Sequence, residues 1–256
     1  MLFRSFFKVY AEEIGVPFVC LTTVNDVDEE LIQLMKKANC DMIRFGVESA
    51  TPRIRKNIIC RSFPQNNIYK AFSLCKKYGI RTFSYNIIAH PTETKEEILN
   101  TLKLNSNLLP SGIRVSLGYP YKGTKYYEIA KKMNQIDDDN VIFHNYSTYT
   151  KFKFSSEEKL WIDKCRSYFK WWLNLFLENE ASQIYKNHIE YLESLSSKEW
   201  NDSAIREQLM KIDEETTDYL KSHNIIHFTS PFSDRPDIVI LFDGEISVKK
   251  EEIDEH

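Results

Sequence analysis

The chain has 256 residues, of which 42% are hydrophobic, and its 34 Lys and Arg against 37 Asp and Glu give a net charge of −3. This composition is rich enough in apolar residues to exclude a disordered chain. The near-neutral charge provides no basic field that would recruit nucleic acid or an anionic membrane. No apolar run reaches the roughly 20 residues that cross a bilayer. We therefore expect a cytoplasmic protein that binds neither nucleic acid nor membrane.

The alternation of apolar strands with amphipathic helices starts at the first residues. A helix is expected over 2–14, because Gly15 follows it in the position of a left-handed C-terminal cap and Pro17 stops it. Residues 16–22 are short and apolar, as in a buried strand, and residues 26–40 carry apolar residues at helical spacing with acidic residues in the first turn.

The same strand and helix unit then recurs along the chain. Strands are expected at 42–49, 81–90 and 113–119, with helices at 68–79, 94–109 and 125–133. The helix at 94–109 starts with a capping box, Thr94-x-x-Glu97. About four such units in series predict an α/β fold with a parallel sheet covered by helices, either doubly wound or barrel-like. We favour a partial (β/α) barrel of the TIM type.

The chain changes character after residue 135, so we expect one domain over 1–135 and a second, mostly helical region over 136–256. A capping box at Ser155-x-x-Glu158 opens a long aromatic helix that continues to residue 195, and further helical segments follow at 199–222. A terminal β-hairpin is predicted near 238–248, with its turn at Asp243-Gly244.

The carboxyl ends of parallel strands face the ligand in such folds, so the residues at the strand tips are the candidates for a site. Strand alternation places Arg44, Gly46 and Glu48 on one face, where Gly46 leaves room beside the Glu48 carboxylate. A carboxylate with space beside it suits a ribose diol or an amine. The alternative is that Glu48 only caps the next turn or pairs with Arg44.

A second candidate lies at the next strand tip. His90, together with Glu48 and Glu93, has the side-chain types of a metal-assisted hydrolase, although a lone His before Pro is more often an ordinary loop residue. The five cysteines are odd in number and never closer than fifteen residues. This spacing indicates free, buried thiols and fits neither a disulfide framework nor a paired-thiolate metal site.

Three stretches together resemble the radical S-adenosylmethionine (SAM) superfamily, in particular its large group with cobalamin-binding domains. They are residues 26–49, FSYNIIAHPTETKEEILNTLKL and YPYKGTKYYEIAKK, which stand in the order and spacing of that family's third to sixth core strands. The resemblance covers about residues 1–135, the C-terminal part of the core barrel. It implies that Glu48 bonds the polar parts of SAM, that Tyr85 and Ile87 face its ribose and adenine, and that Tyr119 lies near the adenine.

The chain also departs from that family. The C-x-x-x-C-x-x-C loop that holds the four-iron, four-sulfur cluster is absent, and A-H-P-T at 89–92 replaces the family's G-L-P-G. The resemblance then implies the C-terminal part of a radical SAM enzyme, inactive alone, whose cluster and cobalamin ligands lie elsewhere. The alternatives are a catalytically inactive interaction protein and, more weakly, the hydrolase. Strand 16–22 would have an open edge, which an N-terminal half, another polypeptide or self-association would cover.

Overall fold

The computed structural model describes residues 2–136, 150–230 and 237–243. These residues form two compact units, Met1–Lys153 and Phe154–His256. The predicted domain boundary after residue 135 lies directly before residues 137–149, which are outside the described residues, and it stays a prediction.

Strands and helices alternate in the first unit, as the sequence pattern predicts. The elements are α1 Leu2–Glu13, β1 Phe18–Thr22, α2 Glu29–Lys37, β2 Cys40–Glu48, the π-helix η1 Ile54–Ile58, α3 Gln65–Lys77, β3 Arg81–Ile88, α4 Lys95–Leu108, β4 Gly112–Leu117 and α5 Lys125–Lys132. The capping box of Thr94 and Glu97 is present at the start of α4, and Gly15 takes a left-handed φ of 61° after α1.

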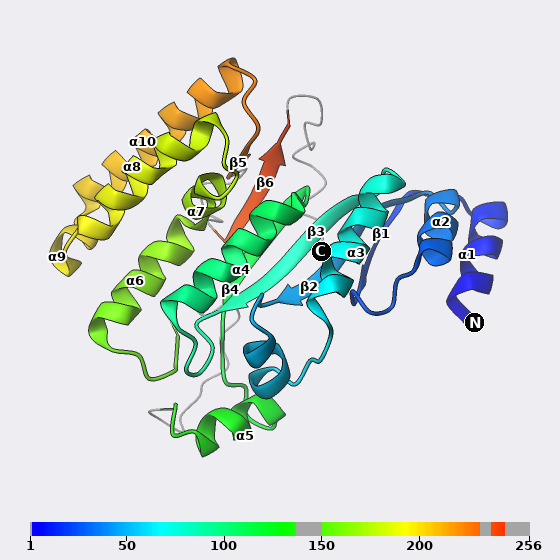
Figure 1. The fold of residues 1–256 in the computed structure, drawn as a ribbon, viewed down its shortest axis with the longest axis horizontal. Coiled ribbons are helices and arrows are strands. Elements are labelled where there is room, and N and C mark those ends of the chain that lie inside the picture. Colours follow the sequence, from blue (N-terminus) through cyan, green and yellow to red (C-terminus); the bar gives the residue numbers. More distant parts are fainter. Residues whose placement is uncertain (1, 137–149, 231–236, 244–256) are drawn as a thin grey trace. The chain divides into compact units, whose positions relative to one another are not determined.

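The four strands of this unit are parallel neighbours in chain order, β1-β2-β3-β4. A doubly wound sheet would reverse its strand order and place helices on both faces. Here α2, α3 and α4 run along the same side of the strands (Figure 1). Sequential order with helices on one side is the arrangement of a (β/α) barrel wall, so the predicted fold class is confirmed.

The two faces of the sheet differ in their burial. On the side of the helices, Ile43, Phe45 and Val115 are 0% exposed. The opposite side, which we call the inner face, carries the paired rows Leu21, Arg44, Phe83 and Gly46, Tyr85, Arg114. Several of these residues are half-buried or exposed. The inner face is therefore the less covered side, as expected for the face that a barrel turns toward its ligand.

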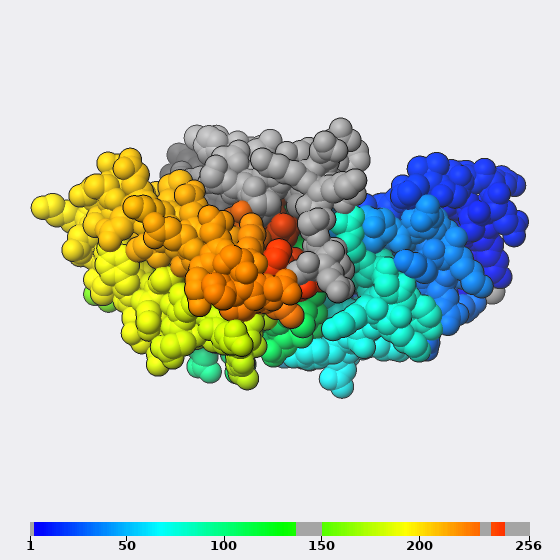
Figure 2. Space-filling view, turned by 90° about the horizontal axis from the view of Figure 1, so that it is seen from above, coloured from blue at the N-terminus to red at the C-terminus, as the bar shows by residue number. Residues whose placement is uncertain are grey.

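Helix α1 packs beside the sheet edge with one side and leaves its other side exposed. Phe7 stacks on Phe18 of β1 with ring centroids 5.6 Å apart, and α1 lies next to α2 at one end of the first unit (Figure 2). Phe3 and Phe6 are 73% and 53% exposed. Among the described residues of this unit, β1 pairs with β2 alone. The expected open edge is thus present in this part of the chain.

The second unit is mainly helical, which confirms the prediction for this region. Its elements are α6 Ser156–Ser167, α7 Phe169–Leu175, α8 Glu180–Ser194, α9 Ser197–Trp200, α10 Ser203–Ser222, β5 His227–Thr229 and β6 Ile238–Phe242. Strands β5 and β6 pair antiparallel. No helix within the described residues is long and apolar enough to span a bilayer.

The single long helix expected from residue 156 to 195 is wrong, because the chain forms α6, α7 and α8 there. The first break is at Tyr168, whose φ of −127° and ψ of 29° are not helical. The second follows Glu178, which has a left-handed φ of 54°, and Asn179 then starts α8 with its own capping box. Aromatic periodicity continues through both breaks, so it conceals them.

The predicted hairpin is only partly within the described residues. Strand β6 occupies its first arm, but Gly244 of the expected turn and everything after it lie outside the described residues. Strand β5, which pairs with β6, is a short strand that the sequence pattern did not indicate.

Gly118 provides a test of the packing at the end of β4. A Cβ there would lie 2.6 Å from the Tyr126 hydroxyl and 3.0 Å from the carbonyl oxygen of Ala89. We expect Gly118→Ala to lower the free energy of unfolding by about 1–3 kcal/mol through overpacking. The control is Gly123→Ala, where nothing lies within 4 Å and only the φ of 83° is unfavourable. Chemical denaturation of both variants measures the difference, and equal losses would contradict the proposed clash.

Candidate functional site

Glu48 ends β2 in an unusual backbone conformation. Its φ is 66°, the left-handed region that residues with a side chain rarely adopt, and the residue is 8% exposed. Its carboxylate accepts a hydrogen bond from Arg61 at 2.7 Å. A Cβ on Gly46 would lie 2.8 Å from Glu48 Oε1 and 2.9 Å from Arg61 Nη1. Gly46 therefore provides the space that this ion pair occupies.

The partner of Glu48 corrects one alternative from the sequence. Arg44 does not pair with Glu48 but contacts the Tyr85 hydroxyl and the Phe83 ring. Burial raises the pKa of the Glu48 carboxyl, and the charge of Arg61 partly offsets this effect. No pattern in the sequence indicated that Arg61 pairs with Glu48, because a long loop separates Arg61 from the strand.

The loop after β2 is held in place by a buried arginine. Arg55, in η1, is 1% exposed and donates to the carbonyl oxygen of Ser49 at 2.7 Å. Its guanidinium also lies over the ring of Phe63, 5.0 Å from the centroid. Burial lowers the pKa of Arg55. The π-helix and this arginine were not predicted, and they fix the loop that carries Arg61.

The other residues that were predicted to contact SAM lie on β3 and directly after β4. Tyr85 and Ile87 are half-buried on β3, and Tyr85 is in register with Gly46, which brings it close to Glu48. Tyr119 follows β4, is 6% exposed and contacts Tyr121 with ring centroids 4.9 Å apart. The strand tips thus bring Glu48 and Tyr85 together. Their binding of SAM stays a prediction.

The loop after β3 keeps a left-handed backbone without glycine. Ala89 and Thr92 have φ values of 58° and 64°, and they stand where the resembled motif has its two glycines. The backbone path that glycine would permit is therefore present, at the expense of strain. The replacement of both glycines therefore leaves the left-handed conformation of the loop in place.

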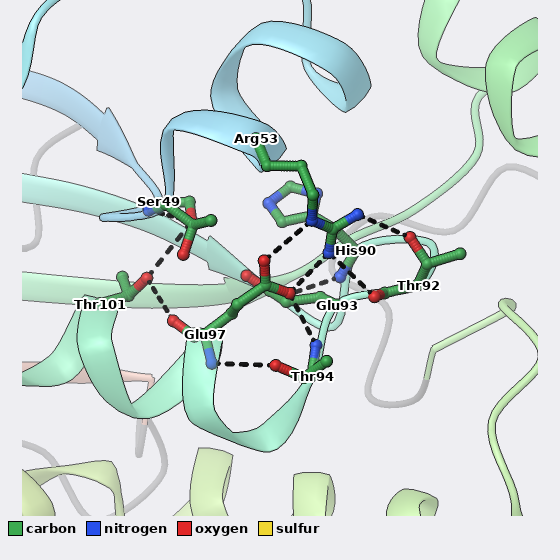
Figure 3. A network of polar contacts seen from close by, with 9 residues as sticks. Ser49, Arg53, His90, Thr92, Glu93, Thr94, Glu97 and Thr101 are labelled. Carbon is green, nitrogen blue, oxygen red and sulfur yellow. Dashed lines mark hydrogen bonds and ion pairs between the residues drawn. The ribbon is translucent and has the colours of Figure 1, made fainter.

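Polar contacts connect this loop to the loop after β2 (Figure 3). Arg53 forms an ion pair with Glu97 at 2.6 Å and donates to the carbonyl oxygen of Thr92 at 3.0 Å. The amide of Ala50 donates to the Thr101 hydroxyl at 2.9 Å. Since both strained loops are bonded to α4, their conformations depend on each other.

His90 and Glu93 are buried beneath this network, at 1% and 3% exposure. His90 Nδ1 is hydrogen-bonded to the Tyr126 hydroxyl at 2.8 Å, and Glu93 accepts from the His90 amide at 3.0 Å. Burial lowers the pKa of His90 to about 3 and raises the pKa of Glu93 to about 8. Both side chains are therefore neutral near pH 7 in the folded state.

The hydrolase alternative gains no support from this arrangement. Within the described ranges, no group of three or more His, Cys, Asp and Glu side chains has the geometry to hold a metal ion. His90 is bonded to Tyr126, and Glu48 is bonded to Arg61. The two residues are thus engaged with different partners.

All five cysteines are free thiols, and Cys60 is exposed, which corrects the expectation that all of them are buried. Cys20 and Cys40 come together on neighbouring strands, and the hydrogen bond between their thiols lowers the pKa of Cys20 while it raises that of Cys40. Sequence spacing could not show this proximity. A pair of thiols does not supply the three thiolates of a four-iron, four-sulfur cluster.

A parallel sheet in sequential strand order with helices on the outer face is typical of (β/α) barrels, whose sites lie at the carboxyl ends of the strands. The sequence profile of the radical SAM superfamily matches residues 4–104. Over these residues the chain is similar to the radical SAM superfamily, the family that its motifs resemble.

Two curated relatives match a similar part of the chain. An uncharacterized methyltransferase of Pyrococcus horikoshii is 30% identical over 143 residues, 56% of this chain and 30% of the relative. A putative methylthiotransferase of Methanocaldococcus jannaschii is 25% identical over 136 residues, 53% of this chain and 30% of the relative. The chain thus matches about a third of the length of these relatives.

A solved structure with a similar arrangement is the cobalamin-dependent S-adenosylmethionine radical enzyme OxsB, with aqua-cobalamin and S-adenosylmethionine bound. The TM-score is 0.47 and the identity is 13%, over 87% of this chain and 40% of OxsB.

The strain at Thr92 is open to a direct test. We expect Thr92→Gly to raise the free energy of unfolding by about 1 kcal/mol, because glycine adopts the left-handed φ without the clash of a branched side chain. The substitution also removes the exposed hydrogen bond, 3.0 Å long, that Arg53 donates to the Thr92 hydroxyl. The expected gain in the free energy of unfolding is the net result of both changes. Thr94→Ala, which removes the α4 cap nearby, is expected to lower stability by about 1 kcal/mol instead. A destabilised Thr92→Gly would argue against strain.

The raised pKa of Glu93 predicts a pH dependence. In the unfolded chain this carboxyl ionises near its usual value of 4.5, but in the fold it stays protonated up to about pH 8. The lowered pKa of His90 makes its own contribution to stability rise up to about pH 6.5, which opposes Glu93 there. Net stability should therefore fall between about pH 6.5 and 8, by on the order of 2 kcal/mol. Glu93→Gln should abolish this fall, whereas Glu96→Gln at an exposed position should preserve it. Unfolding titrations at several pH values decide; identical profiles for wild type and Glu93→Gln would refute the assignment.

Proposed function

We propose that this chain provides the SAM-facing part of a radical SAM enzyme that transfers a methyl or methylthio group. The superfamily match over residues 4–104 and the names of the two curated relatives support this proposal. The observation that carries it is Glu48, a buried carboxylate held at a strained strand tip beside Gly46 and Tyr85. Strain of this kind persists where the surroundings impose it, and it is frequent at ligand sites.

The residues fit the nucleoside part of SAM. The open inner face offers Tyr85 and Ile87 as an apolar and aromatic surface, and Glu48 offers an acceptor for hydroxyl groups. When bound to a reduced cluster, SAM supplies a carbon-centred radical or a methyl group. This chain's residues would orient the nucleoside and exclude water from it.

The iron–sulfur cluster does not fit this chain. Its sequence has no C-x-x-x-C-x-x-C motif, and the described residues hold no group of three suitable side chains. In this proposal the thiolates come from outside residues 1–256, as does any cobalamin site. Such a supplier would also meet the open edge of β1.

Binding of S-adenosylhomocysteine to the purified chain tests the site without any cluster. We expect Glu48→Gln to weaken this binding at least tenfold, since a charge-assisted hydrogen bond contributes roughly 1.5–3 kcal/mol. The matched control is Glu96→Gln, on the exposed first turn of α4. Equilibrium dialysis measures both variants. Equal affinities would remove Glu48 from the site, and no binding by the wild type would overturn the proposal for this chain.

The activity itself requires the missing thiolates. The experiment mixes the chain with a polypeptide that carries the reconstituted cysteine motif, under anaerobic and reducing conditions, and follows 5′-deoxyadenosine and S-adenosylhomocysteine by chromatography. The expected result is SAM turnover only in the mixture. Absence of turnover and of complex formation with every such polypeptide encoded beside this chain would contradict the enzyme proposal.

A second candidate is an interaction protein without catalysis, and the apolar surface of α1 and β1 favours it. Phe3, Phe6 and Leu21 are 73%, 53% and 71% exposed, and β1 carries no charged residue that would protect its edge. In this proposal the edge pairs with a strand of another polypeptide or of a second copy. Self-association of the chain would supply that partner in the simplest case.

Sedimentation velocity tests this surface. We expect wild-type chain to form dimers or larger species at micromolar concentration and the double variant Phe6→Glu, Leu21→Lys to be monomeric. Tyr219→Glu changes an equally exposed aromatic residue in the second unit and should leave assembly unchanged. A monomeric wild type would reject self-association and leave only a different polypeptide as the partner.

A further inference from the structure

Arg44 lies at the middle of β2 with its side chain on the inner face, where it borders the proposed nucleoside site through Tyr85. Its Nη1 donates weakly to the Tyr85 hydroxyl at 3.4 Å, and its guanidinium lies 5.7 Å from the centroid of Phe83. The Nε atom is buried without a hydrogen-bond partner. An unbonded buried donor of this kind is costly, and the single long bond at Nη1 leaves most of the five donors of the guanidinium unused within the described residues. A ligand that accepts from the terminal nitrogens of Arg44 would therefore be stabilised.

The neighbouring charges leave Arg44 uncompensated. Asp41, three residues earlier, forms an ion pair with Arg81. Glu48, four residues later, forms one with Arg61. No carboxylate of the described residues pairs with Arg44. The carboxylates of β2 therefore already have cationic partners, and the middle of the inner face has a positive charge without a counterion.

An apolar surface lies beside this charge. Leu21 of β1 is in register with Arg44 and is 71% exposed, and Val19, on the same face, is 45% exposed. On the other side of Arg44, the same row continues with Phe83. A guanidinium flanked by aliphatic and aromatic side chains suits an anion with an apolar body.

We propose that the inner face binds a second ligand through Arg44, a carboxylate with an apolar body that packs on Val19 and Leu21. The proposal rests on the proposed function, in which this face is the ligand-bearing one. Four residues of strand, about 13 Å, separate Arg44 from Glu48, and Tyr85, whose hydroxyl accepts from Arg44, lies where the two sites adjoin. An α-amino acid group fits poorly at Arg44, because its ammonium would lie beside a guanidinium and the nearby carboxylates are already paired. The ligand class is thus a simple carboxylate.

The experiment follows the Nε–H signal of Arg44 by nitrogen-15 NMR, assigned from its loss in Arg44→Lys. Hexanoate is the probe, hexanamide is its uncharged control, and S-adenosylhomocysteine and 5′-methylthioadenosine test the nucleoside site separately. We expect hexanoate to shift the signal in a saturable manner and hexanamide to leave it unchanged. Arg44→Met should weaken hexanoate binding at least tenfold, and Lys103→Met, on the exposed side of α4, should not change it.

The outcomes separate this proposal from the previous one. No saturable response to hexanoate, or an equal response to hexanamide, overturns the carboxylate site even where the nucleosides bind. A response of Arg44 to S-adenosylhomocysteine alone assigns the guanidinium to the cofactor and also overturns the proposal. A response to hexanoate without any nucleoside binding supports the Arg44 site and rejects the SAM site. Circular dichroism and thermal unfolding check that Arg44→Lys and Arg44→Met retain the fold.

Discussion

The buried polar contacts between α4 and the sheet are the constraint on which the first unit depends. Thr101 and Asn105 of α4 are 0% exposed. Thr101 accepts from the amide of Ala50 at 2.9 Å, and Asn105 donates to the Asn86 side chain at 2.9 Å. Buried polar groups are stable only when they are bonded, so α4 has one position on the sheet. That position fixes the carboxyl ends of β2 and β3, where the candidate site lies.

The strained residues at these ends persist because surrounding contacts hold them. Glu48 and Thr92 both have left-handed φ values of 66° and 64°, which an isolated chain would avoid. Arg55 fixes the loop after Glu48 through Ser49, and Arg53 fixes the loop at Thr92. Strain costs about 1–3 kcal/mol at each such residue, and the contacts with α4 and the two arginines offset it.

The contrast between the two faces of the sheet connects the fold with the proposed chemistry. Helices cover the outer face of β2, β3 and β4, whereas the inner face displays Tyr85, Arg44 and the exposed Leu21. In the two proposals, the strand tips of this face bind a nucleoside and Arg44 in its middle binds a carboxylate, so the face would hold two ligands. The thiolates that would make such a site a radical enzyme are not in this chain. In the proposed function, the chemistry depends on a polypeptide segment that supplies them.

Local sequence patterns determined the elements of this protein, because helix caps, left-handed glycines and strand periodicity act over a few residues. They gave the strand and helix order of the first unit, the capping boxes and the position of Glu48 at a strand tip. Only the tertiary structure decided that Arg61 is the partner of Glu48 and that Tyr126 is the partner of His90, since the residues of these pairs are 13 and 36 positions apart in the chain. It also decided the breaks at Tyr168 and Glu178, where packing overrides a continuous aromatic pattern. Long-range partners depend on how elements pack in three dimensions, which periodicity along one chain does not encode.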